Sequence, residues 1–403
     1  MAYILAYDFG TGGIKASLYD EAGVSLAAGF DAYPTLYPAS GFHEQCPEAW
    51  WRATVVSTRR LLASLPAGTA ERVAAIGLSG HSLGVVPMDA QGQLLRETVP
   101  IWSDSRPDVQ PSAFFERISE AEWYLMTGSG FPPPLYSVFK LMWFRDHEPE
   151  MFSRVHTILG TKDYINYRLT GVLATDFSYA SGSGVYDLKN RCYAPRLIEA
   201  AGLPPEIFAE IVPSTQVLGT LTAAAAQELG LPRTVNVVAG GVDNACMSLG
   251  AGAFRDGRAY NSLGSSSWIA VSSSVPLLDA VKRPYVFDHV VPGQYVSAVA
   301  IFSAGTAFSW VRDHMCRDLI ERAAREGRSA YGLMDAEAAT SPIGANGVLF
   351  NPTLAGGNSL DATPAVRGAF MNLELRHTRA DLLRATMEGV ALGLRNVLDE
   401  LRK

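Results

Sequence analysis

Cysteine is scarce in this chain, and the few cysteines form no pattern. They are Cys46, Cys192, Cys246 and Cys316, and no two of them have a C-x-x-C spacing. Structural zinc sites and disulfide frameworks need closely spaced or regularly paired cysteines, so neither kind of scaffold is predicted. Thiols without such a pattern are typical of a reducing compartment, and we expect a cytoplasmic protein.

Long apolar runs and an excess of positive charge are also missing. No stretch approaches the ~18 consecutive apolar residues of a membrane span, and the N-terminus has no basic segment typical of a leader. The formal net charge is −7, from 33 Lys and Arg against 40 Asp and Glu. An acidic chain lacks the basic surface that binds nucleic acid or an anionic membrane, so we expect neither partner.

What the chain does have is enough apolar material for real cores. Hydrophobic residues make up 48% of 403 residues, and a chain of this length typically forms two or three domains. No low-complexity linker divides it. The composition therefore predicts a compact protein whose function depends on local motifs.

The first motif is a glycine-rich turn between two short strands. Ile4–Tyr7 is an apolar strand that runs into Asp8-Phe9-Gly10-Thr11-Gly12-Gly13, and Ile14–Tyr19 continues as a second strand. Glycines let backbone N–H groups approach a phosphate, and Thr11 adds a hydroxyl. Asp8 is a carboxylate of the kind that holds magnesium directly or through water. The motif therefore predicts binding of a β- or γ-phosphate.

A second motif delivers another carboxylate. Val235–Ala239 is a short β-branched run, typical of a buried strand, and Gly240-Gly241 ends it just before Asp243. Asn244 begins what we expect to be a helix. A carboxylate beside a helix N-terminus is stabilised in its charged form, so Asp243 is expected to stay ionised.

A third motif lies about twenty residues further along. Leu263-Gly264-Ser265-Ser266-Ser267 is a turn of small residues between two predicted strands, rich in N–H groups and hydroxyls that bind phosphate. Taken singly, Gly240-Gly241-Val242-Asp243-Asn244 and Ser265-Ser266-Ser267 are each more typical of an ordinary turn than of a binding site. Two glycine-rich hairpins in one chain indicate two related domains that face one nucleotide.

The ordered set of motifs resembles the FGGY carbohydrate kinases of the actin-like ATPase superfamily, and most closely their xylulokinase branch. The resemblance runs from Tyr3 to about Leu401. Further landmarks lie between the motifs in the family's order: Pro47-Glu48-Ala49-Trp50-Trp51, Ile101-Trp102-Ser103-Asp104-Ser105-Arg106, Lys140-Leu141-Met142-Trp143-Phe144 and Lys162-Asp163-Tyr164. The whole series is far more specific than any single match.

This resemblance implies both fold and function. The expected fold is α/β, with two ribonuclease-H-like domains, of the actin-like ATPase type, that flank a cleft. We place the N-terminal domain at residues 1–231 and the C-terminal domain at residues 232–403. The expected activity is ATP-dependent phosphorylation of a small sugar, a pentulose as in xylulokinases, with ATP and Mg²⁺ bound in the cleft. Domain closure is expected to exclude water from the reaction.

The resemblance also assigns roles to particular residues. Asp243 corresponds to the catalytic base, and Asp8 to the residue that positions Mg²⁺. The expected nucleotide-binding residues are Asp8, Gly10, Thr11, Gly12, Gly264, Ser265, Ser266 and Gly305. The expected sugar-binding residues are His81, Ser82, Leu83, Asp104, Lys140, Asp243 and Asn244.

Two features leave alternatives open. Xylulokinases have a Met-His pair where this chain has Ser82-Leu83, so kinases for ribulose, another ketose, a tetritol or glycerol stay in view, as does a non-catalytic sugar-binding homologue. Asp104 and Arg106 are also compatible with an ion pair on a surface loop, without contact to the sugar.

The end of the chain differs from the family pattern. Family members continue after the helix that corresponds to residues 379–403 into a strand, a run of glycines and a closing helix. We therefore expect an incomplete second domain that lacks its last strand and helix. Weak ATP binding and self-association, such as a homodimer, are the expected consequences.

Overall fold

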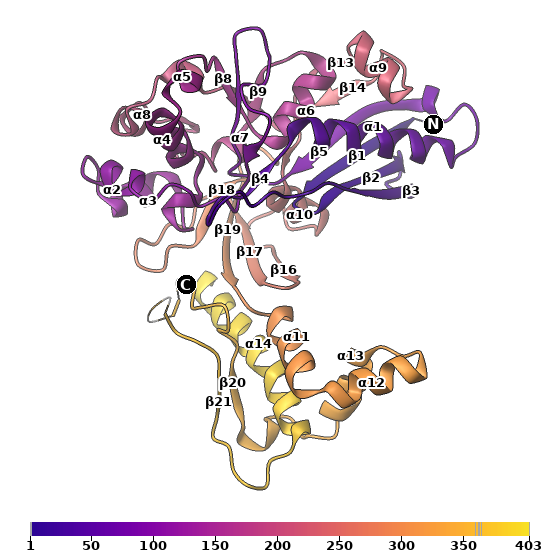
Figure 1. Cartoon of the computed structure of the whole chain (residues 1–403), viewed down its shortest axis with the longest axis vertical. Coiled ribbons are helices and arrows are strands. Elements are labelled where there is room, and N and C mark those ends of the chain that lie inside the picture. Colours follow the sequence, from indigo (N-terminus) through magenta and orange to yellow (C-terminus); the bar gives the residue numbers. More distant parts are fainter. Residues whose placement is uncertain (1, 359, 362, 364, 403) are drawn as a thin grey trace. The chain divides into compact units, whose positions relative to one another are not determined.

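The computed structural model describes residues 2–358, 360, 361, 363 and 365–402, and it divides into two compact units (Figure 1). Unit 1 contains Met1–Asp256, Ser272–Ala280 and Val286–Val296, and unit 2 contains Gly257–Val271, Val281–Tyr285 and Ser297–Lys403. The sequence prediction assigned residues 232–256 to the second domain. In the structure they are part of unit 1, because β14 (Asn236–Val238) pairs with β5 (Val73–Gly80) in its main sheet.

The main sheet of unit 1 begins as a meander of three antiparallel strands. These are β1 (Tyr3–Gly10), β2 (Gly13–Asp20) and β3 (Ser25–Ala32), and the first two contain the predicted strands Ile4–Tyr7 and Ile14–Tyr19. β5 then pairs with β1 in parallel, and the sheet order is β13-β14-β5-β1-β2-β3. Two further strands belong to it, β13 (Val217–Thr220) and, paired with β5, β15 (Gly241–Val242).

Helix α1 (Pro47–Ala63) packs against β2 and β3. Pro47 occupies its first turn, where the missing N–H costs nothing. Trp50 and Trp51 are 1% and 3% exposed and belong to the main core, so these two aromatic side chains are packing residues.

Unit 1 contains further strands and helices outside this sheet. Its other strands are β4 (Glu44–Gln45), β6 (Val86–Met88), β7 (Val99–Pro100), β8 (Thr157–Leu159), β9 (Ala174–Asp176), β10 (Tyr186–Asp187), β11 (Cys192–Tyr193) and β12 (Glu210–Val212). Its other helices are α2 (Gln110–Phe115), α3 (Glu120–Thr127), α4 (Ser137–His147), α5 (Pro149–Phe152), α6 (Thr161–Thr170), α7 (Phe177–Ala180), α8 (Pro195–Ala201), α9 (Ala223–Leu229) and α10 (Asp243–Gly250).

The second sheet has the order β16-β17-β19-β18. Its strands are β16 (Ala259–Leu263), β17 (Ser267–Ser273), β18 (Tyr285–Asp288) and β19 (Tyr295–Ile301), and the last three run across the boundary between the two units along the chain. Unit 2 also contains the hairpin β20 (Leu349–Asn351) and β21 (Ala369–Met371), and the helices α11 (Gly305–Met315), α12 (Arg317–Glu326), α13 (Ala330–Ala338) and α14 (Arg379–Leu401).

The core of unit 2 includes the helix that the sequence placed at residues 379–403, which the structure shows as α14. Leu394 and Val397 of α14 form a buried cluster with Ile269, Val299 and Ile301 of β17 and β19. These side chains recur at helical spacing on α14 and at alternate positions on the strands, which is the pattern that lets a helix cover one face of a sheet.

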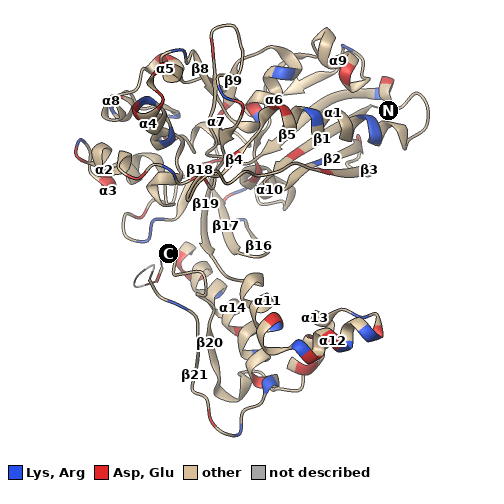
Figure 2. Ribbon diagram, in the orientation of Figure 1, with Lys and Arg blue, Asp and Glu red and all other residues tan. Residues whose placement is uncertain are grey.

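The distribution of charge agrees with the acidic composition. Lys and Arg are interspersed with Asp and Glu along the ribbon (Figure 2). In the described part of the chain, no helix is long and apolar enough to cross a membrane. All four cysteines are free thiols.

Candidate active site

Asp8 lies near the end of β1 with a partner on each neighbouring strand. The register pairs it with Lys15 of β2 and with Ser79 of β5. Ser79 Oγ donates a hydrogen bond to Asp8 Oδ1 at 3.0 Å, and Lys15 Nζ lies 3.4 Å from Asp8 Oδ2. The side chain of Asp8 is 37% exposed, so its carboxylate is held in place and remains accessible to a ligand.

Asp243 is the first residue of α10, at the point where β15 ends. Its side chain is partly exposed, yet the surrounding protein removes enough water to raise its pKa to about 7, and the nearby charge of Asp8 acts in the same direction. The N–H of Asn244, which donates to Asp243 Oδ1 at 2.7 Å, and the charge of Lys15 lower the pKa by less. The expectation that Asp243 simply stays ionised was wrong, because burial outweighs the helix N-terminus.

The backbone just before Asp243 is held at two points, Gly240 and Val242. Gly240 has φ +70°, and a Cβ there would lie 2.0 Å from the carbonyl oxygen of Leu78, so only glycine fits. The N–H of Val242 donates to Ser178 Oγ at 2.9 Å. Ser178 in turn belongs to a buried polar cluster with Asp176. The position of the carboxylate is therefore set by the fold beneath it.

The first turn, Gly10–Gly13, connects β1 to β2. Its Thr11 hydroxyl accepts a hydrogen bond from Trp102 Nε1 at 2.9 Å. Trp102 is 41% exposed and comes from the loop that the family resemblance places on the sugar side. The structure therefore joins a predicted phosphate-binding residue directly to a predicted sugar-side loop.

The second turn, Leu263–Ser267, connects β16 to β17 within unit 2. Its carbonyl groups bond to the start of α11: the N–H of Gly305 donates to the carbonyl of Gly264 at 2.9 Å, and the N–H groups of Ala304 and Thr306 donate to that of Ser265. A Cβ on Gly305 would lie 2.6 Å from the Gly264 carbonyl oxygen. The predicted residues Gly264, Ser265 and Gly305 are thus brought together, with Ser266 beside them.

Three predicted sugar-binding residues, His81, Ser82 and Leu83, follow β5. Their side chains are 3%, 7% and 1% exposed. His81 bonds to Thr161 Oγ1 and packs edge-on against Trp50, and burial lowers its pKa to about 4, which keeps it neutral. Leu83 has φ +63°, which is an unfavourable backbone conformation for a residue with a branched side chain. Residues with such strained backbone angles occur most often at functional sites.

Lys140 and Asp104 are fully buried, and both are engaged within the protein. Lys140 Nζ donates to the carbonyl oxygens of Leu83, Ile101 and Leu135 at 2.8–2.9 Å, which uses all three of its protons. Asp104 accepts from the guanidinium of Arg106 through both oxygens. The predicted ion pair is therefore present, and it is buried.

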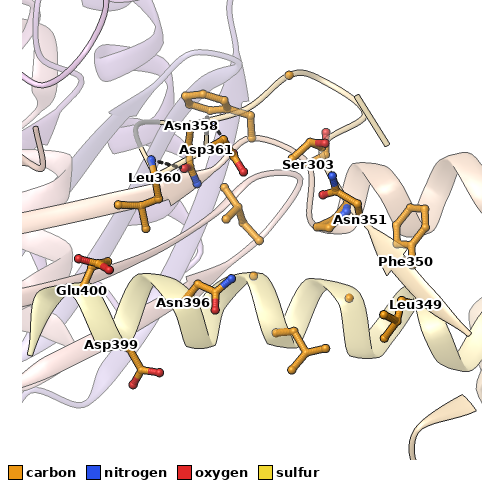
Figure 3. Close-up of a pocket in the computed structure, with 18 of the residues that line it drawn as sticks. Ser303, Leu349, Phe350, Asn351, Asn358, Leu360, Asp361, Asn396, Asp399 and Glu400 are labelled. Atoms are coloured by element: carbon orange, nitrogen blue, oxygen red, sulfur yellow. Dashed lines mark hydrogen bonds between the residues drawn. The ribbon is translucent and has the colours of Figure 1, made fainter. Parts of the chain in front are cut away.

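A cavity of about 490 Å³ lies in unit 2 between α14, β20 and the loop that contains Asn358 (Figure 3). Its charged lining consists of the carboxylates of Asp361, Asp399 and Glu400 against the ammonium of Lys282. An excess of negative charge repels polyphosphate. The two turns, whose N–H groups and hydroxyls are uncharged donors, suit phosphates better than this cavity does.

The site also suits a magnesium ion. In the described residues no group of three or more His, Cys, Asp or Glu side chains is arranged to hold a metal. A dedicated cage is unnecessary, because Mg²⁺ in kinases is bound by one or two carboxylates together with water and substrate phosphates. Asp8, accessible and beside the first turn, offers such a carboxylate.

Three partners at this site were missed in the sequence. Ser79 and Lys15 hold Asp8, and Trp102 holds Thr11. Lys15 follows the hairpin and was within reach of prediction, because a two-residue turn fixes its register opposite Asp8. The positions of Ser79 and Trp102 depend on contacts between distant segments.

Comparison with known proteins agrees with this geometry. The FGGY family of carbohydrate kinases, N-terminal domain, matches residues 3–250, and the C-terminal domain of the same family matches residues 259–403. Xylulose kinase from Bacillus subtilis is 28% identical over 406 residues, covering 100% of this chain and 78% of that protein. Gluconokinase from the same organism is 27% identical, covering 98% of this chain and 76% of that protein.

The solved structures agree as well. The crystal structure of xylulose kinase from Rhodospirillum rubrum aligns with a TM-score of 0.89 and 29% identity, covering 99% of this chain and 79% of that one. With two family domains matched from residue 3 to residue 403, the α/β fold and the two glycine-rich turns have a common explanation. The chain belongs to the FGGY family of carbohydrate kinases.

Proposed function

We propose that this protein transfers the γ-phosphoryl group of ATP to the terminal hydroxyl of a pentulose such as xylulose, with Asp243 as general base. The observation that carries the proposal is the position and pKa of Asp243. A carboxylate whose pKa is about 7 is matched to proton transfer at neutral pH. The xylulose kinases among its relatives support the choice of sugar.

The chemistry requires little beyond positioning and charge. Asp243 takes the proton from the attacking hydroxyl, the new O–P bond forms, and the bond between the γ-phosphorus and the bridging oxygen of ADP breaks. Asn244, next to the base, orients the sugar. Asp8 would hold Mg²⁺, which would supply positive charge to neutralise the phosphates. Donors of the two turns, Gly10–Gly13 and Leu263–Ser267, bind the phosphate oxygens.

We propose further that the predicted sugar-side residues act mainly by shaping the pocket. Lys140 and Asp104 have their polar atoms engaged inside the protein, so they hold the loops that face the sugar. The loop that contains His81, Ser82 and Leu83 forms part of the wall of the sugar pocket, and the strained backbone of Leu83 sets the shape of that wall. Free thiols suit the cytoplasmic location that we expect, and a homodimer stays a prediction.

A second substrate class has an observation in its favour. Ser82 and Leu83 stand where xylulokinases have a Met-His pair, Leu83 is buried in a strained conformation, and a gluconokinase is also among the relatives. A less polar contact at this place favours a sugar with a different hydroxyl pattern. Other ketoses, polyols such as tetritols and glycerol, and a sugar acid are therefore the alternatives.

A substrate panel tests both proposals. The purified chain is incubated with ATP, Mg²⁺ and each of xylulose, ribulose, a hexulose, a tetritol, glycerol and gluconate, and ADP and phosphorylated product are measured. We expect the highest kcat/KM for a pentulose. A higher value for gluconate or a polyol contradicts the pentulose assignment, and sugar binding without any transfer contradicts the kinase activity itself.

A further inference from the structure

Three acceptor atoms of the first turn, Gly10–Gly13, are occupied by side chains from other segments. Tyr33 Oη donates to the carbonyl of Gly10 at 2.6 Å, and Gln45 Nε2 donates to the carbonyl of Thr11 at 2.7 Å. The hydroxyl oxygen of Thr11 accepts from Trp102 Nε1. These three acceptors are therefore satisfied within the protein itself.

Fixing a carbonyl also fixes the N–H of the next residue. Every peptide bond of the described chain is trans, so the C=O and N–H of one peptide unit point in opposite directions. The hydrogen bond to the Gly10 carbonyl therefore sets the direction of the Thr11 N–H, and the bond to the Thr11 carbonyl sets that of the Gly12 N–H. Similarly, Thr11 Oγ1, having accepted one bond, keeps its O–H as a donor.

The orientation of the Gln45 amide is determined by its neighbours. Trp50 Nε1, which can only donate, lies 2.9 Å from Gln45 Oε1, so the carbonyl end of the amide faces Trp50. The NH₂ end then faces the Thr11 carbonyl and Thr35 Oγ1, at 2.7 and 2.8 Å. Gln45 is 0% exposed, so water does not compete for these bonds.

Tyr33 is suited to the same task. It is 6% exposed, and burial together with the nearby charge of Asp8 raises the pKa of its phenol, which keeps the O–H protonated and able to donate. Tyr33 is the residue after β3, and Gln45 is the last residue of β4, two residues before α1 begins. Two separate segments thus hold one turn from its buried side.

We propose that Gln45 and Tyr33 are positioning residues that orient the N–H groups of Thr11 and Gly12 as donors to the phosphates of ATP. Neither side chain needs to touch the nucleotide. They hold the carbonyl groups of Gly10 and Thr11 on the buried side, so that a phosphate meets the N–H groups that follow them and the Thr11 hydroxyl instead of these two carbonyl oxygens, whose partial negative charge repels it. This inference deepens the proposed function and rests on it for the identity of the ligand.

Substitution of the two residues tests the proposal. Gln45→Met keeps the length of the side chain and removes the amide, and Tyr33→Phe removes only the hydroxyl. We expect Gln45→Met to raise the KM for ATP and the Kd for inorganic triphosphate about 10- to 100-fold, and Tyr33→Phe to raise both about 3- to 10-fold. The KM for the sugar should change less than twofold in both variants.

Matched controls separate positioning from stability. Gln110 is a buried glutamine of unit 1 whose amide donates to Asp146, away from the turn, and Trp51 Nε1 bonds to Glu228, in contrast to Trp50. Gln110→Met and Trp51→Phe should lower the unfolding temperature and leave the KM for ATP unchanged. Trp50→Phe, which frees Gln45 Oε1, should raise the KM for ATP.

The outcomes are distinct. Unchanged triphosphate affinity in folded Gln45→Met and Tyr33→Phe proteins overturns the inference, as does an equal rise in the KM for ATP in the control variants. If Gln45→Met does not fold, Tyr33→Phe alone decides. Wild-type protein that binds triphosphate but phosphorylates no sugar refutes the proposed function, while the binding measurements still test the role of Gln45 and Tyr33.

Discussion

The two glycine-rich turns of this chain perform the same local task in different ways. In unit 1, the carbonyl groups of Gly10 and Thr11 are held by the side chains of Tyr33 and Gln45. In unit 2, the carbonyl groups of Gly264 and Ser265 are held by backbone N–H groups at the start of α11. The conformation of the first turn therefore depends on the side chains of Tyr33 and Gln45. The conformation of the second turn depends on Gly305, which lets the backbone of α11 approach the backbone of the turn.

The neighbours of the two turns differ as well. The first turn lies beside the carboxylates of Asp8 and Asp243 and the ammonium of Lys15. The second has only small and hydroxylated residues in its own sequence, Gly264 to Ser267. Under the proposed function, unit 1 carries the catalytic base and the Mg²⁺ ligand, and the second turn, in unit 2, supplies phosphate-binding donors.

The largest expected effect follows from removing the base. Asp243→Asn keeps the shape of the side chain but cannot accept a proton, so kcat should fall roughly 10²- to 10⁴-fold while the sugar Kd changes little. Steady-state kinetics and calorimetry with the sugar measure the two quantities. Turnover close to that of the wild type would remove Asp243 from this role.

A smaller effect is expected at the metal site. Asp8→Ala should raise the magnesium concentration needed for half-maximal activity by about 10- to 100-fold, because a ligand or its water bridge is lost. Sugar affinity should stay the same. Loss of sugar binding together with an unaltered magnesium dependence would contradict the role given to Asp8.

The second turn should be sensitive at Gly305. Gly305→Ala places a Cβ 2.6 Å from the Gly264 carbonyl oxygen, so the turn or the start of α11 must shift. We expect the KM for ATP to rise about 10-fold through weakened hydrogen bonds to phosphate, with no change in the KM for the sugar. Gly332→Ala in α13, where a Cβ meets only an ordinary contact at 3.9 Å, is the control and should leave both constants unchanged.

Lys140 allows a test on stability and sugar affinity together. Lys140→Met removes a donor from three carbonyl groups, and those of Leu83 and Leu135 lose their donor altogether, whereas Ile101 still accepts from the Asp104 N–H. The free energy of unfolding should fall by about 2–4 kcal/mol, as for other broken buried networks. The loops that hold Leu83, Ile101 and Leu135 lose their common anchor, so the KM for the sugar should rise more than that for ATP. Equal effects on both substrates would favour a purely structural role.

The smallest effect concerns stability against pH. The pKa of Asp243 is raised from 3.8 to about 7 in the folded protein. As the pH rises, the unfolded chain therefore loses this proton at a lower pH than the folded protein does. The free energy of unfolding falls as the pH rises between these two values. Asp243→Asn should therefore unfold at a higher temperature than the wild type at pH 8, on the order of a few degrees, and at a similar temperature at pH 4. A wild type that is more stable than the variant at pH 8 would refute the raised pKa.

Much of the framework could be predicted from the sequence. The strands β1 and β2 and the helix α14 were expected from the sequence, and Asp243 at the junction of β15 and α10 follows from a buried run ended by two glycines. These features are local, so a few neighbouring residues determine them. The family resemblance extended them to the complete two-domain architecture.

What escaped prediction depends on segments that meet only in the folded chain. Lys140 and Asp104 resemble sugar contacts in sequence, but each finds its partners inside the protein, on loops that converge from distant positions. The pKa of Asp243 depends on how much protein surrounds it, which no local pattern reports. Gln45 carries no motif at all, and only its distance to Thr11 reveals a role.

The pH dependence of the transfer reaction tests the central claim most directly. With Asp243 as the base, kcat/KM for the sugar should increase with pH, with an apparent pKa of about 7, and level off above it, because only the ionised carboxylate accepts the proton. The residual activity of Asp243→Asn should not show this increase with pH. A profile that is flat between about pH 5.5 and 8.5, or one that the substitution leaves unchanged, would contradict the assignment of Asp243 as the catalytic base.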